Sequence, residues 1–369
     1  MVVGGGPAGA AAAITGACAG LSVVLFDARA DDASTIRRRR SSPGEAGSTT
    51  SEEPGETVHP AIETVLDRLG LRETFLAAGF ARYDAIAVDA HGMRSLCALG
   101  ADESGPWRGH HVHRSIFDAM LRERARAAGA EVRSTRVDEP LVDETRRVVG
   151  VRTGRERIRA RFVIDASGRA AFLARRLEIS TATYSEQLFA TYGWVEDAGP
   201  SSAPPLFRVE PDGWTWQARV DERKRAWVRV ARCRGAVPTD LERARPIGRS
   251  RARDVTWRLV RPTAGDGYLL AGDTAARLDP AWGQGILRAL VAGIQAARVA
   301  EVVIHRPAQA QRALVAWDRW VVDTFEDAAA ALAADYAARG IALSVSGLER
   351  APPPRAPTQT WGAPDEAIA

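Results

Sequence analysis

Cysteine is scarce in this chain, and its spacing limits the kinds of site that it can build. The 369 residues include three cysteines, Cys18, Cys97 and Cys233, which lie far apart and form no C-x-x-C pair. Neither a disulfide framework nor a thiolate metal site is therefore indicated. We expect reduced and mostly buried thiols.

Long apolar runs are missing, and lysine is nearly absent. No stretch of 18 or more apolar residues occurs, and the glycine-rich start lacks the basic and apolar regions of a signal peptide. We therefore expect a soluble, cytoplasmic protein with no membrane contact. Lys224 is the single lysine, and the net charge of +4 is small for this length. A nucleic-acid interface needs basic residues clustered on one face, so we expect no nucleic-acid partner.

One basic run, Arg37–Arg40, stands apart from this even distribution. It is followed at 41–53 by a stretch rich in Ser, Thr, Gly and Glu that has no apolar period. Such composition is typical of a mobile surface loop. An arm that binds an anion or docks an acidic partner is the alternative interpretation.

Histidines gather at one place in the sequence, at His110, His111 and His113. Adjacent and alternate residues on a strand seldom converge on one ion. The pattern therefore predicts a strand with mixed faces, and no metal is expected.

The first 30 residues carry the pattern of a nucleotide-binding turn. Three residues that start a strand precede a glycine-rich turn, a helix of small residues follows, and the apolar run 21–26 ends on Asp27. In such a unit the first glycine permits a tight turn, the second lets the backbone approach a pyrophosphate, and the third lets the helix pack on the strand. Gly4, Gly6 and Gly9 fit these roles, and Asp27 lies where an acid accepts from a ribose hydroxyl. Strands usually run about five residues, so the first strand is short.

Two later segments repeat this design of a strand followed by a turn. At 159–177 an apolar strand runs into Asp165 and Gly168 and then into an arginine-rich helix. At 265–303 the strand YLLAG leads to Asp273, the turn DPAWGQG and a long helix of small residues. A carboxylate placed after a strand and before a helix can accept from a ribityl or ribose hydroxyl.

Taken in order, the three segments resemble those of the FAD-dependent monooxygenases of the p-hydroxybenzoate hydroxylase type and of their relatives, the flavin-dependent halogenases. The resemblance covers roughly residues 1–305 and implies FAD as cofactor, with NAD(P)H as reductant, directly or through a flavin reductase. The segment 111–133 resembles the strand-to-helix segment whose arginine contacts FAD, and Ser115 with Asp118 is expected to cap its helix. The residues that the resemblance assigns to FAD are Gly4, Gly6, Gly9, Asp27, Arg114, Asp165, Gly168, Gly272, Asp273, Pro280, Gly283, Gly285 and Ile286.

Three residues are candidates for a catalytic role. The stretch 54–71 resembles a glycine-glutamate segment that borders the flavin in the halogenase-like branch, which makes Glu56 and His59 candidates. A lone histidine is also compatible with a surface residue at the start of a helix. Trp282, in the turn WGQGI, is either a lid against bulk water or packing at a helix start. The backbone N–H groups of that turn suit a developing oxyanion.

The expected fold class is α/β, with a Rossmann-like FAD-binding domain, an inserted antiparallel β-sheet substrate domain and a C-terminal helical segment. The expected divisions are 1–80, 105–178 and 255–305 for the FAD-binding domain, 81–104 and 179–254 for the substrate-binding sheet, 306–340 for the C-terminal helices, and 341–369 for a flexible tail.

Tryptophan marks the expected substrate sheet. The stretch GWTWQARV alternates Trp214, Trp216 and Ala218 onto one face, and Trp227 on the next strand is expected to cross-pair with them. An aromatic core of the sheet is one interpretation. The wall of a pocket for an aromatic substrate is the other.

The resemblance implies an FAD-dependent monooxygenase that hydroxylates an aromatic substrate through a flavin C4a-hydroperoxide. GETVHP, GWTWQARV and DPAWGQG resemble flavoproteins that modify tryptophan side chains of a partner protein to mature quinone cofactors, so the substrate is an aromatic small molecule or such a tryptophan. Tryptophan halogenases carry a lysine in the stretch that corresponds to 80–88, where this chain offers Asp84 and no lysine. A halogenase, a prenyl-lipid reductase and a non-catalytic FAD-binding scaffold for maturation remain the alternatives.

Overall fold

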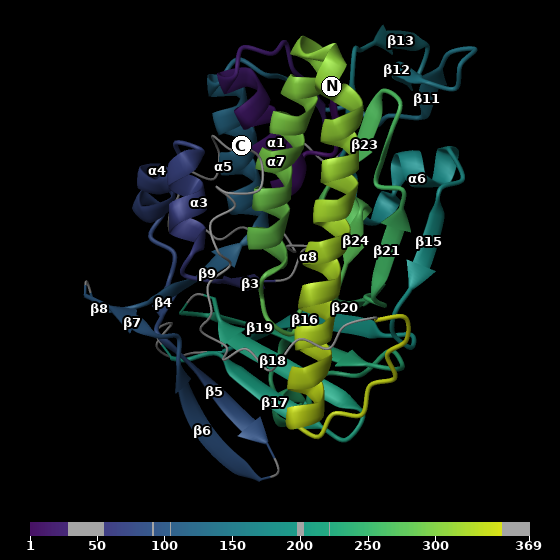
Figure 1. The fold of residues 1–369 in the computed structure, drawn as a ribbon. Helices are drawn as coiled ribbons and strands as arrows, with labels where there is room; N and C mark the ends of the chain where they lie inside the picture. Colours follow the sequence, from purple (N-terminus) through teal and green to yellow (C-terminus); the bar gives the residue numbers. More distant parts are fainter. Residues whose placement is uncertain (29–54, 91, 104, 198–202, 221, 349–369) are drawn as a thin grey trace.

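The computed structural model describes residues 1–28, 55–90, 92–103, 105–197, 203–220 and 222–348. The predicted loop at 37–53 lies outside these residues. Figure 1 shows two lobes, a parallel sheet covered by helices in the upper part and an antiparallel sheet below it. The predicted α/β class, with an inserted antiparallel sheet and C-terminal helices, is confirmed.

A six-stranded sheet, counted over the described residues, forms the centre of the upper lobe in the order β10-β2-β1-β14-β23-β22. Its neighbours pair in parallel, except that β22 is antiparallel to β23. The strands are β1 (Val2–Val3), β2 (Val24–Phe26), β10 (Glu131–Arg133), β14 (Val163–Asp165), β22 (Ala264–Gly265) and β23 (Tyr268–Leu270). The central strands are buried on both faces, as in sheets that helices cover on each side. Their carboxyl ends therefore meet at one edge.

The helices of the upper lobe pack closely because small residues line their contacts. These helices are α1 (Pro7–Cys18), α5 (Arg114–Ala127), α7 (Gly285–His305) and α8 (Ala310–Ala338). A Cβ on Gly293 of α7 would lie 2.1 Å from the backbone oxygen of Ala8 in α1, so the two helices touch backbone to backbone at this point. None of the helices in the described ranges has both the length and the apolar character that crossing a membrane requires.

The lower lobe is built on a sheet in the order β20-β16-β19-β18-β17-β5-β6, seven strands within the part of the chain that the structure describes. The strands are β5 (Ala85–Ala90), β6 (Met93–Ala98), β16 (Phe189–Glu196), β17 (Leu206–Glu210), β18 (Gly213–Arg219), β19 (Lys224–Ala231) and β20 (Pro246–Asp254). Pairing is antiparallel except between β17 and β5. The sheet thus joins the two separate segments that the sequence assigned to the substrate domain.

Smaller elements connect the lobes and cover the edges. One sheet has the order β3-β9-β4, another β11-β12-β13 and a third β15-β21-β24, and β7 pairs with β8. The strands are β3 (Gly55–Val58), β4 (Arg82–Tyr83), β7 (Ala101–Asp102), β8 (Gly105–Pro106), β9 (Gly109–His113), β11 (Glu139–Val142), β12 (Val148–Thr153), β13 (Glu156–Arg159), β15 (Ser180–Thr183), β21 (Arg258–Arg261) and β24 (Ala276–Arg277). The described residues also form the short helices α3 (Ile62–Arg68), α4 (Arg72–Ala77) and α6 (Phe172–Arg176).

The chain after α8 differs from the flexible tail predicted to begin at residue 341. Ile341 is buried, and Val345 forms a β-bridge with Ser185. The backbone N–H of Glu186 donates to the Ser344 carbonyl at 2.9 Å. These contacts hold residues 341–348 against the segment before β16, and the remainder of the predicted tail, 349–369, lies outside the described residues.

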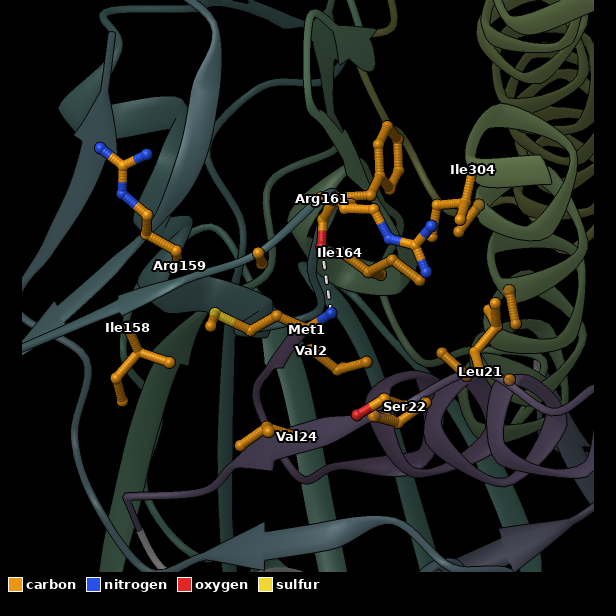
Figure 2. A pocket seen from close by; sticks show the side chains of 17 residues that line it. Met1, Val2, Leu21, Ser22, Val24, Ile158, Arg159, Arg161, Ile164 and Ile304 are labelled. Carbon is orange, nitrogen blue, oxygen red and sulfur yellow. Dashed lines mark hydrogen bonds between the residues drawn. The ribbon is translucent and has the colours of Figure 1, made fainter. Parts of the chain in front are cut away.

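A cavity of about 270 Å³ lies at the amino ends of the parallel strands, where β1 is two residues long. Figure 2 shows Met1, Val24 and Ile304 around it, with a hydrogen bond from the Met1 amino group to the Phe162 carbonyl at 3.0 Å. Burial lowers the pKa of this amino group from 8.0 to about 6. The cavity is on the edge of the sheet opposite to the carboxyl ends, so it is separate from the site described below.

The expectation of buried cysteines is wrong, because all three thiols are exposed. Cys18 is the last residue of α1, Cys97 lies on the exposed strand β6, and Cys233 follows the end of β19. Positions at the ends of elements and on an outer strand leave a small side chain open to solvent.

Candidate FAD site and the lobe interface

The turn after β1 has the geometry that a cofactor phosphate needs. Gly4 has φ of +106°, and a Cβ there would lie 2.3 Å from the Ala166 carbonyl oxygen. A Cβ on Gly9 would lie 1.8 Å from the Gly4 oxygen, so this glycine lets α1 pack on the turn. Gly6 precedes the first residue of α1, and a Cβ there would meet nothing within 4 Å. The space in front of the helix N-terminus therefore fits a diphosphate, which the N–H groups and the helix dipole favour.

Asp27, predicted to accept from a ribose hydroxyl, follows β2 beside this turn. Its side chain is 8% exposed and forms an ion pair with Arg122 of α5 at 3.2 Å. A Cβ on Gly5 would lie 2.5 Å from an Asp27 carboxylate oxygen, which places the acid against the glycine turn. Arg122 is a partner that the sequence reasoning missed, since nothing in the spacing of α5 relates it to β2.

The turn after β14 lies next to the glycine turn, but Asp165 has a structural role in it. One carboxylate oxygen accepts from the Ser167 N–H at 2.9 Å and the other from the Leu173 N–H at 2.7 Å. Burial raises the pKa of this carboxyl, while the hydrogen bonds from Ser167 and Leu173 oppose that effect. The side chain shapes the turn that leads into α6, and its oxygens are already occupied by backbone amides.

The third turn, after β23, joins the other two. The Gly168 N–H donates to Thr274 Oγ1 at 2.7 Å, and a Cβ on Gly272 would lie 2.9 Å from the Ala8 Cβ. Asp273 is exposed at this point. The three turns predicted from separate parts of the sequence therefore meet at the carboxyl ends of β1, β14 and β23.

The segment from Pro280 to Ile286 leads from this turn into α7 and lies against β3. Gly283 has φ of +61°, and a Cβ there would lie 3.3 Å from the Thr57 carbonyl oxygen. Gly285 is the first residue of α7 and faces open space. The N-termini of α1 and α7 thus open on the same edge of the sheet, and both favour negative charge there.

Glu56 and Arg114 face each other across the β3-β9 junction. Arg114 donates to Glu56 Oε1 at 3.3 Å and binds Asp118 through two nitrogens, each at 3.2 Å. The expected capping pair of Ser115 and Asp118 is wrong: the residue before α5 is His113, whose side chain makes no capping hydrogen bond, and Asp118 binds Arg114 instead. Long guanidinium and carboxylate side chains one helical turn apart form an ion pair, and here that pair takes the carboxylate away from the helix start.

His59 lies at the start of the helical segment that follows β3. Its Nδ1 accepts from the Ala61 N–H at 3.1 Å, which leaves the proton of the neutral ring on Nε2. Burial lowers the pKa of this imidazole. The histidine is half-buried at a helix start, and within the described ranges its ring makes one hydrogen bond, the one from Ala61.

Trp282 is held in place by α8. Its indole N–H donates to Asp335 Oδ2 at 3.2 Å, and Asp335 is also bound by Arg339 at 2.9 Å. The ring is half-buried beside the 280–286 segment.

The tryptophans of the lower sheet lie on two different faces. Trp214 and Trp216 pair with Val230 and Val228, whereas Trp227 pairs with Gln217. Directly paired residues share a face, so Trp227 is on the opposite side from Trp214 and Trp216, and the expected cross-pairing is wrong. Trp227 packs instead with Val195 and Leu241.

The face that carries Trp214 and Trp216 is aromatic and lies toward the FAD lobe. Trp216 also packs with Trp194 of β16, and Trp194 stacks on His113 at 5.6 Å between ring centroids. Trp214 stacks on Phe207 at 5.2 Å. We call the residues Tyr192, Trp194, Phe207, Trp214 and Trp216 the aromatic face. Trp194 and Tyr192 were not predicted, although TYGW shows the same alternation as GWTW.

A buried hydrogen-bond network fixes the aromatic face to the FAD lobe. The Trp214 indole N–H donates to the Tyr336 hydroxyl at 2.5 Å, and that hydroxyl donates to Asp279 Oδ1 at 2.8 Å. The indole N–H of Trp257 donates to Asp279 Oδ2 at 2.6 Å. Asp279 directly precedes the 280–286 segment, so one carboxylate connects this segment to the lower sheet and to α8. Sequence reasoning missed it because its partners come from distant segments.

Comparison with known proteins is consistent with this geometry. A tryptophan halogenase family model matches residues 101–228. Digeranylgeranylglycerophospholipid reductase of Methanoculleus marisnigri is 27% identical over 351 residues, which covers 86% of this chain and 80% of that protein. The flavin-dependent halogenase CmlS superposes with a TM-score of 0.75 at 22% identity, over 91% of this chain and 64% of that one. Peptidyl tryptophan dihydroxylase QhpG superposes with a TM-score of 0.69 at 22% identity, over 92% of this chain and 74% of that one.

The chain is therefore an enzyme of the FAD-dependent oxidoreductase class. Its relatives and structural neighbours include geranylgeranyl reductases and flavin-dependent halogenases. The glycine turn, the two helix N-termini and Asp27 fit FAD, since together they provide open space, positive dipoles and an acid beside a ribose position. The neighbours catalyse different reactions, so class membership alone does not select one.

Proposed function

We propose that this protein is an FAD-dependent monooxygenase that hydroxylates an aromatic substrate. The aromatic face carries the proposal, because it borders the lobe with the FAD site and is joined to it by the His113 stack and the Asp279 network. Four of its side chains are buried and Trp216 is half-buried, so Trp216 is the member that would meet a flat substrate ring.

The chain's own residues have definable parts in this reaction. Bound FAD supplies the electrons and the activation of oxygen. The turn at Gly4–Gly9 and the α7 N-terminus would hold it, and Arg114, which Glu56 and Asp118 bind, would contact it. His59 Nε2–H has no acceptor among the described residues, so in this proposal it would donate to an oxygen atom of the substrate or of reacting oxygen. Trp282, fixed by Asp335, helps to exclude bulk water from the 280–286 segment.

Halogenation is the second candidate, since a tryptophan halogenase family model matches the central residues. The stretch 80–88 offers Arg82 as its basic residue, and this guanidinium is 2.7 Å from Glu63. Lys224 begins β19 two residues or about 7 Å along the strand from Ala226, the partner of Trp194, and it pairs with Glu196 at the edge of the aromatic face. Tryptophan halogenases carry a lysine in the stretch that corresponds to 80–88, and its absence here favours hydroxylation.

The substrate class that we propose is a tryptophan side chain of a partner protein, as in the reaction that the name of QhpG describes. The motifs GETVHP and GWTWQARV support this choice over a free small molecule. Efficient oxidation of free phenols or indoles without a partner protein would contradict it.

The test is a product analysis that separates the three reactions of the neighbours. Purified protein loaded with FAD is mixed with reduced flavin or NAD(P)H, ¹⁸O₂, bromide and either N-acetyltryptophan amide or a tryptophan-containing peptide. Hydroxylation predicts a mass gain of ¹⁸O in the indole. A bromine isotope pattern would assign halogenation, and reduction of a geranylgeranyl lipid without oxygen would assign reductase activity. Either result in place of ¹⁸O incorporation refutes the proposal.

A further inference from the structure

Arginines gather where the turn after β14, the strands β20, β21 and β24, and the start of α7 meet. Arg258 and Arg277 are direct cross-strand partners in the antiparallel pair β21-β24. Side chains at such positions have Cβ atoms about 5 Å apart, and like charges placed there repel each other. The backbone register thus holds the two guanidinium groups close together although their charges repel each other.

Carboxylates neutralise this pair only in part. Arg258 binds Asp254 at 2.7 Å through one terminal nitrogen. The Nε atoms of Arg258 and Arg277 are buried, and neither has a hydrogen-bond partner among the described residues. Burial lowers the pKa of Arg277, and the charge of Arg258 lowers it further, while Asp273 acts in the opposite direction.

Two further arginines extend the cluster between the lobes. Arg169, next to Gly168, interacts electrostatically with Arg253 and Arg277, and burial followed by these like charges lowers its pKa. Arg253 lies on β20 of the lower sheet, with its guanidinium 5.0 Å from the centroid of the Tyr192 ring. Tyr192 belongs to the aromatic face. The cluster is therefore continuous with the surface proposed to take the substrate ring.

The balance of charge in this region is strongly positive. Arg169, Arg253, Arg258 and Arg277 are close to two acidic side chains, Asp254 and Asp273, and Asp273 is itself exposed. Half-buried guanidinium groups interact at lower effective dielectric than in water, so bringing them together without an anion is costly. The planar guanidinium group of arginine donates two parallel hydrogen bonds to the oxygens of a carboxylate or a phosphate.

We propose that Arg169, Arg253 and Arg277 form an oxyanion-binding site that holds a carboxylate or phosphate group of the aromatic substrate. The inference rests on the proposed function and defines its substrate class further: an aromatic ring on the aromatic face and an acidic group on the arginines. In a protein substrate this group is an acidic side chain near the modified tryptophan. The same oxyanion chemistry occurs in the phosphates of a nicotinamide dinucleotide, and the position of Arg253 on Tyr192 favours the substrate.

The test compares two ligands of similar shape that differ in charge. FAD-loaded protein is titrated with indole-3-propionate and with indole-3-propanol, with binding followed by calorimetry and by the flavin absorption spectrum. A hydrogen-bonded carboxylate is expected to bind roughly tenfold or more tightly than the alcohol, and the difference should shrink as salt is added. Arg277→Gln and Arg169→Gln should bring the two affinities close together. Arg312→Gln, on the exposed side of α8, is the matched control and should leave the ratio unchanged.

Stability and cofactor retention give independent readouts. Because Arg277 opposes Arg258 directly, Arg277→Gln should raise the melting temperature of the ligand-free protein by a few degrees. It should also leave the FAD content unchanged, since Arg277 is not among the residues assigned to the cofactor. Loss of FAD from this variant would assign the arginines to the cofactor and overturn the inference.

The remaining outcomes are equally decisive. Equal affinity for the acid and the alcohol, or no binding of either, refutes the substrate site. Binding of NADPH or inorganic pyrophosphate that depends on Arg277, without any preference for the indole acid, would assign the cluster to the reductant and also refute it. These measurements need no turnover, so failure of hydroxylation alone would reject the proposed function and leave the anion site standing.

Discussion

His111 allows the electrostatics of the core to be tested with one substitution. The residue is 0% exposed, stacks on Tyr83 at 4.7 Å between ring centroids, and has no hydrogen-bond partner at either ring nitrogen among the described residues. Burial, with a smaller effect of His110, lowers its pKa from 6.5 to about 4. As pH falls from 6.5 toward 4, His111 becomes protonated in the unfolded chain but stays neutral in the folded protein. The free energy of unfolding therefore decreases over this range.

The magnitude follows from linkage between protonation and folding. Over the full interval the loss from this residue is about 3 kcal/mol, and about 2 kcal/mol of it occurs by pH 5. His111→Phe keeps a stacking ring and removes the titration. The variant should be at least as stable as the parent protein at pH 7.5, because two unsatisfied polar atoms leave the core.

The assay is urea unfolding of both proteins at pH 7.5 and pH 5, followed by tryptophan fluorescence. The variant should gain about 2 kcal/mol over the parent between the two pH values, whatever other groups contribute to both proteins. Parallel pH dependence of the two free energies would show that His111 does not titrate as a buried neutral ring, and the reasoning would fail.

The remaining predictions concern the cofactor turn and the lobe interface. Gly6→Ala should leave the melting temperature unchanged but weaken FAD retention, measured by flavin absorbance after gel filtration, because its Cβ enters open space; an unchanged FAD content would contradict this. Gly9→Ala should lose both stability and FAD, because its Cβ would overlap the Gly4 oxygen, and a stable FAD-bound variant would show that the turn adapts. Tyr336→Phe should lower the free energy of unfolding by about 2 kcal/mol, because it leaves the buried Trp214 N–H without an acceptor and removes a donor to Asp279. The measurement is denaturant unfolding. A free energy of unfolding within about 0.5 kcal/mol of the parent, which is typical of a neutral substitution, would show that this network does not stabilise the fold.

Local patterns predicted the backbone of the glycine turn after β1 well. Gly4, Gly6 and Gly9 have the conformations and contacts that the spacing implied, because each depends on neighbours a few residues away. The meeting of the three turns also followed from the sequence, since parallel strands bring their carboxyl ends to one edge. The fold class was predictable for the same reason.

Features that depend on pairing between distant segments were not predictable. Alternation within β18 fixes the common face of Trp214 and Trp216, but the face of Trp227 depends on the register with β19. The same holds for Arg258 and Arg277, which become neighbours through β21-β24 pairing. The remaining difference between prediction and structure comes from side-chain conformation. Asp118 lies where a capping residue is expected, yet its carboxylate is bound by Arg114.

Helix α8 joins the two lobes. At 29 residues it is roughly 40 Å long and runs along both lobes in Figure 1. Asp318 accepts from Thr263 in the upper lobe, whereas Tyr336 binds Trp214 in the lower sheet. Opening the lobes as hinged bodies would break buried hydrogen bonds at one end of this helix. The two lobes therefore keep one relative position while these hydrogen bonds are intact, and the Gly4–Gly9 turn and the aromatic face keep a constant separation.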